Sequence, residues 1–500
     1  MRNIEMPSFP ASLGPGGPEG IHETDRNMSA ELSAEENGGY DGAETGPEAK
    51  LAFAFLWAFL FVAFARPQDF LPGIGLTHLT LVSALLALVA YLGALAVGRA
   101  RLLRSANLLI VLLLTAWFAI GIPFAIYRGG SFEIFTQTWL RTLLFFFLLT
   151  QTLTTISRVR MILWAIVISE VIVSLMSILP GRAALLEGDR LSGVNQGLLG
   201  WNFLGITFSV TLPFLAALFV STASLLQKTL IAAALGSTMW AVILTASRGG
   251  FFGFVVSIVV TWWFVLRGSR SGRLLAMLIP IGLIVGVAKA PDVFWSRLQT
   301  VWTDSATTET YVLQPEAGNR SANKLSAESA EESTRGRQRL LESSLECTAK
   351  FPVFGVGVGA FPLYNGQSTG RPDGWLGTHN TFTQISSEAG IPALVLFLCL
   401  LFTVLSQMKR LRLQLAGNEK KAELRLFATA TLAGTLIFAF QGFFAHIAYE
   451  YLFYYIAGIA AGLWTIAAED AGRDAKENDR SGDFAAPDVA TAPSAWRPEV

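Results

Sequence analysis

The densest group of polar side chains between the long apolar runs lies between Phe351 and Gly390. This segment begins with a glycine-spaced run, FPVFGVGVGAF, and reaches His379 just before the next apolar run. An imidazole titrates near neutral pH and can take a proton from an attacking hydroxyl group. Chemistry on a polar substrate needs side chains that hydrocarbon excludes, so a membrane edge is the expected place for it. We predict that His379 is a catalytic base, and a structural histidine that caps the next helix is the alternative.

Arg248 lies in the sequence SRGG, between two apolar runs that leave almost no loop. A guanidinium is the side-chain group best suited to fork onto phosphate oxygens. Gly249 and Gly250 carry no side chains, so another group can approach the guanidinium closely. We predict a phosphate-binding arginine at the membrane edge, and the alternative is an arginine that extends to the interface without binding substrate.

A second group of cations begins the sequence RGRQRLLESSLECTAK, residues 335–350, with Arg335, Arg337 and Arg339. Apolar side chains at helical spacing among charges predict an amphipathic helix on the outer membrane face. Two cationic walls would suit a diphosphate, which leaves well only if its growing negative charge is stabilised. A solvated helix face is the alternative for these arginines. The apolar positions are Leu340, Leu341 and Leu345.

Three further polar residues are candidates for substrate binding: Arg190, Arg141 and Asn380. Arg190 precedes a polar stretch that leads into an apolar run, and Arg141 lies near the end of another. Each arginine can equally be an interfacial anchor. Asn380 follows the candidate base, where it can hold the imidazole ring or bind substrate.

Metal and nucleotide chemistry are not expected. The two cysteines, Cys347 and Cys399, lie in a polar segment and in an apolar run, so we expect neither a disulfide nor a thiolate metal site. GVGVGAF lacks the G-x-G-x-x-G spacing and follows no βαβ strand, so it predicts a tight turn packed on the membrane. We expect no metal, no cofactor and no nucleic acid.

The composition places all of these residues in a membrane protein. The chain has 500 residues, of which 52% are hydrophobic and only 15% charged, against about 25% charged in soluble domains. The apolar residues form long blocks, which predict an all-α polytopic protein with about twelve transmembrane helices. The blocks are Leu51–Ala65, Leu79–Val97, Leu108–Tyr127, Trp139–Thr154, Met161–Leu179, Phe203–Thr222, Thr229–Ala246, Phe251–Leu266, Leu274–Ala288, Ile391–Gln407, Leu426–Ala445 and Tyr451–Ala467.

The basic residues predict the orientation, because Lys and Arg accumulate in cytoplasmic loops. Alternate loops carry most of them, and the opposite short loops hold only isolated arginines. This bias puts both termini in the cytoplasm and residues 290–390 outside. The basic loops contain Arg99, Arg101, Arg104, Arg158, Arg160, Lys228, Arg267, Arg270, Arg273, Lys409, Arg410, Arg412, Lys420, Lys421 and Arg425.

The domain organisation follows from these runs. Thr303–Thr334 is rich in Ser, Thr, Ala and Glu, and we expect it to be flexible. The predicted parts are a disordered cytoplasmic extension (1–50), nine transmembrane helices (51–289), a large extracytoplasmic loop with the catalytic motifs (290–390), three transmembrane helices (391–467) and a disordered cytoplasmic tail (468–500).

Four motifs in order resemble a known family. They are SRGG at 247–250, GR at 336–337, FPVFGVGVGAF at 351–361, and THNTF followed by SEAGIPAL within 378–394. Together they resemble the signature of the O-antigen ligase and polymerase superfamily over about residues 189–400, and RPQD at 66–69 is similar to many bacterial members. Many members carry an aromatic residue one helical turn after GR, where this chain has Leu341.

The resemblance implies a polytopic glycosyltransferase of the bacterial inner membrane with its active face in the periplasm. Such enzymes take a glycan from an undecaprenyl diphosphate donor and pass it to a lipid A core, another lipid-linked glycan or a protein. They need neither nucleotide nor metal. By motif match, Arg248 and Arg337 would hold the diphosphate, and His379 would activate the acceptor hydroxyl. Arg335 and Arg339 are predicted to bind substrate as members of the same cationic run, independently of the motif match.

Other functions remain open from the sequence alone. A ligase and a polymerase differ in the acceptor, and no motif in this sequence identifies the acceptor. A solute or polysaccharide transporter would also suit twelve spans, but it predicts polar residues near the midplane and broken helices in paired halves. A scaffold without chemistry leaves an arginine beside paired glycines unexplained.

Overall fold

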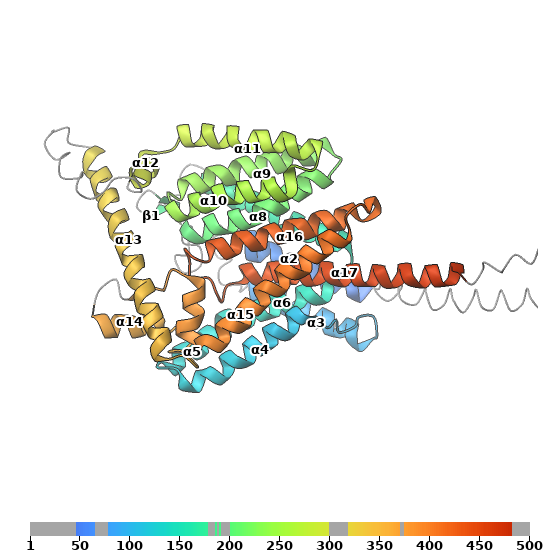
Figure 1. The fold of residues 1–500 in the computed structure, drawn as a ribbon, viewed down its shortest axis with the longest axis horizontal. Coiled ribbons are helices and arrows are strands. Elements are labelled where there is room, and N and C mark those ends of the chain that lie inside the picture. Colours follow the sequence, from blue (N-terminus) through green and yellow to red (C-terminus); the bar gives the residue numbers. More distant parts are fainter. Residues whose placement is uncertain are drawn as a thin grey trace, which may run out of the picture.

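The protein is a bundle of long helices with three further helices at one end, seen in a computed structural model (Figure 1). This all-α architecture confirms the class predicted from the apolar runs. Two strands of two residues each, β1 (Leu186–Glu187) and β2 (Arg190–Leu191), pair in antiparallel register. The residues described are 47–65, 79–178, 186–187, 190–191, 201–299, 319–370 and 375–482.

Ten helices among the described residues are long and apolar enough to cross a membrane. Each corresponds to one of the predicted apolar runs. They are α3 (Leu79–Ala96), α4 (Ala106–Gly121) with η3 (Ile122–Phe124), α5 (Arg128–Ile134) continued by η4 (Phe135–Trp139) and α6 (Leu140–Thr152), α8 (Trp201–Ser221), α9 (Leu225–Leu244), α10 (Arg248–Thr261) with η6 (Trp262–Leu266), α11 (Arg270–Ala288), α15 (Thr381–Gln414), α16 (Ala422–Gln441) with η9 (Glu419–Lys421), and α17 (Tyr451–Gly482).

The other two predicted spans are helices as well. The first is α2 (Pro47–Ala65), whose apolar stretch over Lys50–Ala65 is shorter than the ten others. The second is α7 (Ile156–Ile178), which carries three charged side chains. Every apolar run that the sequence predicted as a span is therefore helical.

The core of the bundle lies around α8, where 89% of the apolar stretch is buried, against 17% for the peripheral helix α11. Helices α9, α10 and α11 lie on one side of α8 and α16, while α3, α4 and α5 lie on the other side of α15 (Figure 1). Exposed leucines and valines on α3, α4 and α11 give the bundle an apolar outer surface that suits lipid.

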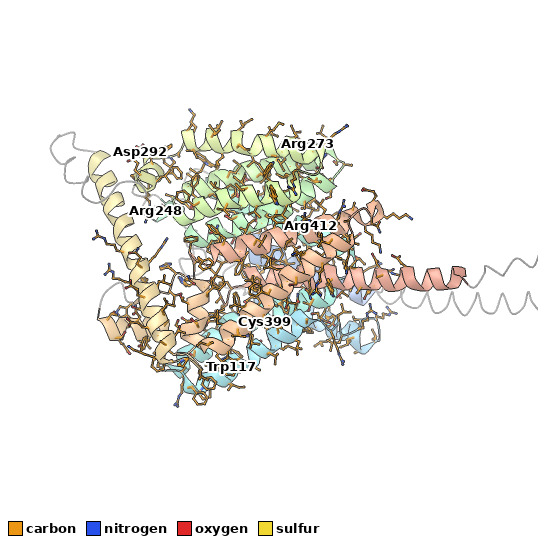
Figure 2. All side chains as sticks on the ribbon, viewed as in Figure 1. Trp117, Arg248, Arg273, Asp292, Cys399 and Arg412 are labelled. Carbon is orange, nitrogen blue, oxygen red and sulfur yellow. The ribbon has the colours of Figure 1, made fainter. Side chains whose placement is uncertain are left out.

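The two ends of the bundle differ in character. At one end lie α12 (Asp292–Gln299), α13 (Asn319–Lys350) and α14 (Phe361–Thr369), with α13 running across the ends of the long helices (Figure 1). Arg248 and Asp292 lie at this end, whereas Arg273 and Arg412 lie at the opposite end (Figure 2). The arrangement agrees with the alternation of basic loops in the sequence.

Two segments are more regular than the sequence suggested. We expected Thr303–Thr334 to be flexible, yet residues 319–334 form the first half of α13, and 303–318 lie outside the described residues. The tail was expected to be disordered from residue 468, yet α17 continues as a helix to Gly482. Ion pairs from Lys421 to Asp474 (2.8 Å) and Asp470 (3.7 Å) hold this extension against η9. Residues 1–46 and 483–500, both in predicted disordered ends, lie outside the description.

Candidate functional site

The site is organised by a break in α15 at Gly390. This residue has φ 86° and ψ 173°, a conformation open in practice only to glycine. A Cβ atom there would lie 1.9 Å from the carbonyl oxygen of Val353. The chain therefore enters α15 as a short polar helix, turns at Gly390, and continues as a membrane helix. The short part begins directly after His379.

The glycine-spaced turn at residues 351–361 satisfies the backbone groups that the break exposes. The N–H groups of Val356 and Gly357 donate to the carbonyls of Ser387 and Glu388, at 2.9 and 2.8 Å. A buried carbonyl without a partner would cost free energy, so the turn stabilises the kinked helix. The run of glycines thus forms a tight turn, as predicted, and the structure shows it packed on α15.

The Glu388 carboxylate adds a further bond between the glycine-spaced turn and α15. It accepts a hydrogen bond from the Gly359 N–H at 3.0 Å. Nearby, the Gln384 side chain accepts from the Ala448 N–H at 3.0 Å. The first part of α15 is therefore joined to the loop Gly442–Glu450, which we call the histidine loop because it carries His446.

His379 lies outside the first turn of α15, because Asn380 is the N-cap. The Asn380 Oδ1 accepts from the N–H groups of Phe382 (2.9 Å) and Thr383 (3.1 Å). Asn380 therefore caps the helix, and the alternative in which His379 is the cap is wrong. Asn380 is buried, and its side-chain amide oxygen is occupied by the two capping hydrogen bonds. His379 adopts φ 51°, a left-handed conformation that is uncommon outside glycine and is found at functional sites.

Arg248 is the first residue of α10, at the end of the bundle where α13 crosses (Figure 2). Ser247 caps this helix by accepting from the Gly250 N–H at 3.1 Å. Gly250 packs against Gly205 of α8, so the second glycine of SRGG serves close helix packing. The first glycine faces the site, because a Cβ atom on Gly249 would lie 3.9 Å from Arg337 Nη1.

Arg337 reaches this position from α13, which is docked on the first part of α15. The Thr348 and Ser386 hydroxyls are 2.8 Å apart, and the Cys347 thiol donates to the Ser387 carbonyl at 3.7 Å. The Nε atom of Arg337 is buried and has no hydrogen-bond partner among the described residues. Burial and the positive charge of Arg248 lower the pKa of Arg337. A buried cation beside another cation suits an anionic ligand.

The predicted amphipathic pattern of α13 is only partly right. Leu340 is buried on the same side as Arg337, together with Ser344 and Cys347. Leu341 and Leu345 are exposed on other sides of the helix, at 38% and 53% of their surface. The face that docks on α15 is therefore made largely of small and polar residues, and an aromatic residue at position 341 would not point into it.

A third arginine, Arg297 of α12, was missed in the sequence. Burial lowers the pKa of Arg297, and the charges of Arg248 and Arg337 lower it further. Edge-to-face packing of Phe294 on Phe251, with ring centroids 5.2 Å apart, holds α12 against α10. We call Arg248, Arg297 and Arg337 the arginine cluster. The only signal for Arg297 was its place in the short amphipathic sequence DVFWSRLQ.

A second imidazole, that of His446, lies beside His379. The ring centroids are 5.0 Å apart and the planes are inclined by 78°. Burial lowers the pKa of His379 to about 3, with smaller contributions from the charges of His446 and Arg337. The protein packed around His446 lowers its pKa too. Both rings are therefore neutral at neutral pH, as a proton acceptor must be. Sequence reasoning passed over His446 as an isolated histidine between apolar runs.

The remaining predicted residues are less closely joined to the cluster. Arg335 is exposed on α13, and its carbonyl accepts from Arg339 Nε at 3.3 Å. Arg141 is exposed on α6 and donates to Gln137, one turn earlier. Arg190 lies in β2, paired with Glu187, and its side chain is outside the description. Substrate binding by these four arginines stays a prediction.

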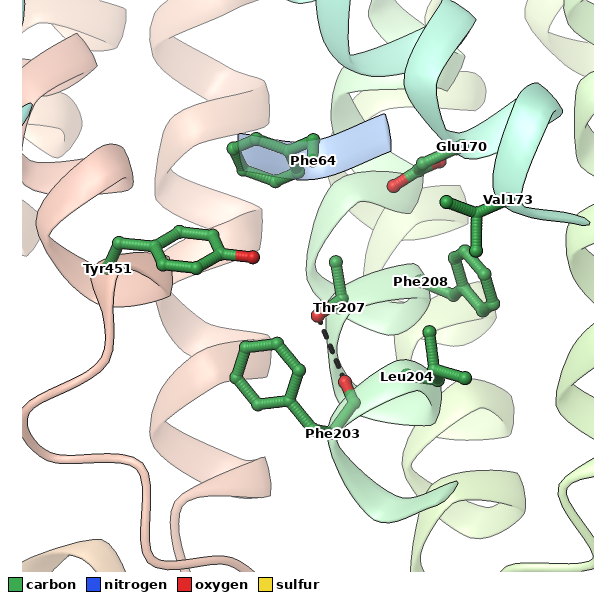
Figure 3. Close-up of a pocket in the computed structure, with 8 residues that line it drawn as sticks. All are labelled: Phe64, Glu170, Val173, Phe203, Leu204, Thr207, Phe208 and Tyr451. Atoms are coloured by element: carbon green, nitrogen blue, oxygen red, sulfur yellow. Dashed lines mark hydrogen bonds between the residues drawn. The ribbon is translucent and has the colours of Figure 1, made fainter. Parts of the chain in front are cut away.

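An enclosed cavity lies away from the arginine cluster, among the apolar side chains of the bundle (Figure 3). The Glu170 carboxyl group points into it, and neither carboxylate oxygen has a hydrogen-bond partner within the described part of the chain. The cavity measures about 20 Å³, room for about one water molecule. Neither an arginine of the cluster nor a histidine lines it. The lining residues are Phe64, Glu170, Val173, Phe203, Leu204, Thr207, Phe208 and Tyr451.

The fold and the site define a polytopic membrane protein with three arginines and two imidazoles at one end of its bundle. Within the described residues, no three His, Cys, Asp or Glu side chains gather as a metal-binding group. Residues 230–398 match the family model described as O-antigen ligase. This match supports the O-antigen ligase and polymerase superfamily that the motifs resemble and, at a coarse level, a glycosyltransferase-type enzyme in a membrane.

The matched region covers about a third of the chain, from α9 to the middle of α15. It contains the whole arginine cluster and His379, whereas His446 lies beyond its end. No curated protein sequence matches the chain.

Proposed function

We propose that the protein transfers a glycan from undecaprenyl diphosphate to an acceptor hydroxyl at the periplasmic face of the bacterial inner membrane. The observation that carries this proposal is the position of Arg337. Its guanidinium lies beside Gly249, next to Arg248, and its charge acts on His379. Two guanidinium groups and a neutral imidazole from three separate elements thus lie at one end of the bundle, which supports a diphosphate site with a base beside it.

The arginine cluster would hold the diphosphate. Arg337 offers a buried Nε–H that has no partner among the described residues, and Arg248 lies at the N-terminus of α10, where backbone N–H groups also favour anions. When the bond from the sugar to the diphosphate breaks, negative charge grows on the phosphate oxygens. Fixed guanidinium groups stabilise that charge without metal or nucleotide.

His379 would be the base. As the acceptor oxygen attacks the anomeric carbon, its proton passes to the neutral imidazole, and the bonding electrons of the sugar–oxygen bond leave with the diphosphate. The products are the glycosylated acceptor, the lipid diphosphate and a proton on His379 that later returns to water. A bound diphosphate also raises the pKa of His379, because an anion nearby favours the imidazolium form. The base therefore becomes stronger when the donor is in place.

The orientation rests on the basic residues. Arg273 and Arg412 lie at the end of the bundle opposite to Arg248 (Figure 2), and basic loops favour the cytoplasmic side. The arginine cluster would then face the periplasm, where lipid-linked glycans are used. The cavity at Glu170 has room for about one water and is too small for a sugar. It therefore gives no support to a solute transporter.

The test is glycan transfer by variants that stay folded in the membrane. Arg248→Ala, Arg337→Ala and His379→Ala are each expected to stop transfer. Lys350→Ala removes an exposed cation from the end of α13 and is expected to leave transfer unchanged. Normal transfer by all three site variants would contradict the proposal.

The matched family is described as O-antigen ligase, and a ligase and a polymerase of this type differ in their acceptor. Cells that carry an inactive variant separate the two activities. Loss of a ligase leaves long lipid-linked chains, whereas loss of a polymerase leaves single repeat units.

A further inference from the structure

We propose that His446 binds the acceptor, holding a sugar hydroxyl beside the oxygen that His379 deprotonates. This inference rests on the proposed glycan transfer and adds to it the residue that reads the acceptor. It is carried by the contact between the two imidazole rings, by the way the histidine loop is held, and by a close approach at Gly377.

The polar groups of the site are contiguous. A Cβ atom on Gly249 would lie 3.9 Å from Arg337 Nη1 and 3.7 Å from the Cβ atom of Phe444 in the histidine loop. His446 of the same loop packs against His379, with ring centroids 5.0 Å apart. In the proposed transfer the arginine cluster holds the diphosphate, and the acceptor hydroxyl meets His379. His446, in contact with that base, is therefore within reach of the acceptor.

The histidine loop is held rigidly against the first turn of α15. The Thr381 N–H donates to the Gly442 carbonyl, and the Thr381 hydroxyl donates to the Ala445 carbonyl, each at 2.7 Å. The Ala448 N–H donates to Gln384 at 3.0 Å. These bonds fix His446 relative to His379 before any substrate binds, which is the property a binding site needs.

Gly377 gives His446 its place. A Cβ atom on Gly377 would lie 2.8 Å from His446 Nε2 and 2.9 Å from Cδ2. The backbone of Gly377 is thus in contact with the ring, and any side chain there would displace the imidazole. Since the atoms in conflict belong to the end of a side chain, the ring can move while the backbone stays.

The surroundings of His446 suit a sugar. His446 is an exposed residue, so a ligand can reach its ring. A neutral imidazole offers one hydrogen-bond donor and one acceptor, which match a pair of sugar hydroxyls. Phe443 and Phe444 of the same loop expose 58% and 39% of their surface. Aromatic faces of this kind can pack against the apolar face of a sugar ring.

The experiment measures the acceptor and donor dependence of transfer separately. Purified protein receives a synthetic polyprenyl diphosphate carrying one repeat unit, with lipopolysaccharide that lacks O-antigen, or a second donor molecule, as the acceptor probe. His446→Ala and Gly377→Ala are expected to raise the KM for the acceptor about tenfold, the value of one lost hydrogen bond in a desolvated site. The KM for the donor is expected to stay within about twofold. His446→Asn, which keeps a donor and an acceptor, is expected to recover part of the loss.

The possible outcomes are distinct. An acceptor KM that is unchanged in both His446→Ala and Gly377→Ala overturns the inference while the proposed transfer stands. A rise in the donor KM instead places His446 on the diphosphate side and also overturns it. If the unaltered protein transfers glycan to neither probe, the proposed function fails, and the inference fails with it. Gly377→Ala keeps the test valid if His446→Ala does not fold.

Discussion

Lowering the pH from 8 to 5 is expected to leave kcat/KM for the lipid diphosphate donor nearly unchanged. The profile of kcat/KM reports the pKa values of groups in the free enzyme. In the free protein, burial lowers the pKa of His379 to about 3, and the nearby His446 and Arg337 add to the effect. A disubstituted diphosphate keeps its two negative charges over this range, so the donor itself does not titrate.

The size of the effect follows from the pKa. A histidine with an ordinary pKa of about 6.5 would be only about 3% neutral at pH 5, and the rate would fall about thirtyfold from pH 8. With a pKa of about 3, the ring is still about 99% neutral at pH 5. The two cases differ by more than the scatter of initial-rate measurements.

The assay is the initial rate of glycan transfer at low donor concentration, per folded protein. Stability has to be measured alongside, because a histidine whose pKa is lowered by folding stabilises the protein above its unfolded pKa of about 6.5. That contribution is lost as the pH falls from there toward 3. At saturating donor, bound diphosphate raises the pKa of His379, so kcat is expected to fall at a higher pH than kcat/KM. A thirtyfold fall in kcat/KM with an apparent pKa near 6.5 would refute this reasoning.

Three further predictions concern the frame of the site and its surroundings. Gly390→Ala places a Cβ atom 1.9 Å from the Val353 carbonyl at φ 86°, so thermal unfolding in detergent is expected to show a loss of about 3 kcal/mol or more. Glu388→Gln weakens the bond from the Gly359 N–H, and we expect kcat to fall about tenfold as the first part of α15 loosens. Glu170→Gln is expected to leave transfer within about twofold, because the cavity is separate from the arginine cluster.

A control variant and the contradicting outcomes test these three predictions. Gly93→Ala, in a helical position with no atom within 4 Å of the added Cβ, is expected to be neutral or stabilising. Equal melting of the Gly390 and Gly93 variants would contradict the account of the kink. Unchanged kcat in Glu388→Gln would remove that carboxylate from the frame, and loss of transfer in Glu170→Gln would join the cavity to the mechanism.

The helices could be predicted because a membrane span can be recognised from the length and hydropathy of an apolar run. Every predicted apolar run is a helix. The kink at Gly390 could not be predicted, because it depends on the turn at residues 351–361 supplying partners for the carbonyls of Ser387 and Glu388. The glycine-spaced run and the segment that contains Gly390 are both visible in the sequence, but their contact forms only in the folded protein. The first half of α13 was expected to be flexible because of its Ser-, Ala- and Glu-rich composition, yet it is helical.

The candidate site was predictable where a residue type stood out from its neighbours. Arg248 beside paired glycines, Arg337 in a basic run and His379 in a polar segment all did so. Arg297 and His446 did not, because a single cation in an amphipathic stretch and a single histidine between spans are common. They become notable only when α12 packs on α10 and the histidine loop packs on α15.

The central claim is that this site breaks a glycosyl diphosphate bond with side chains alone. The most direct measurement is the incubation of purified protein with a polyprenyl diphosphate glycan and an acceptor, in a chelator and without nucleotide. We predict glycosylated acceptor together with an equal amount of released lipid diphosphate, and neither product from Arg337→Ala. No transfer by the unaltered protein, or full transfer by Arg337→Ala, would contradict the account.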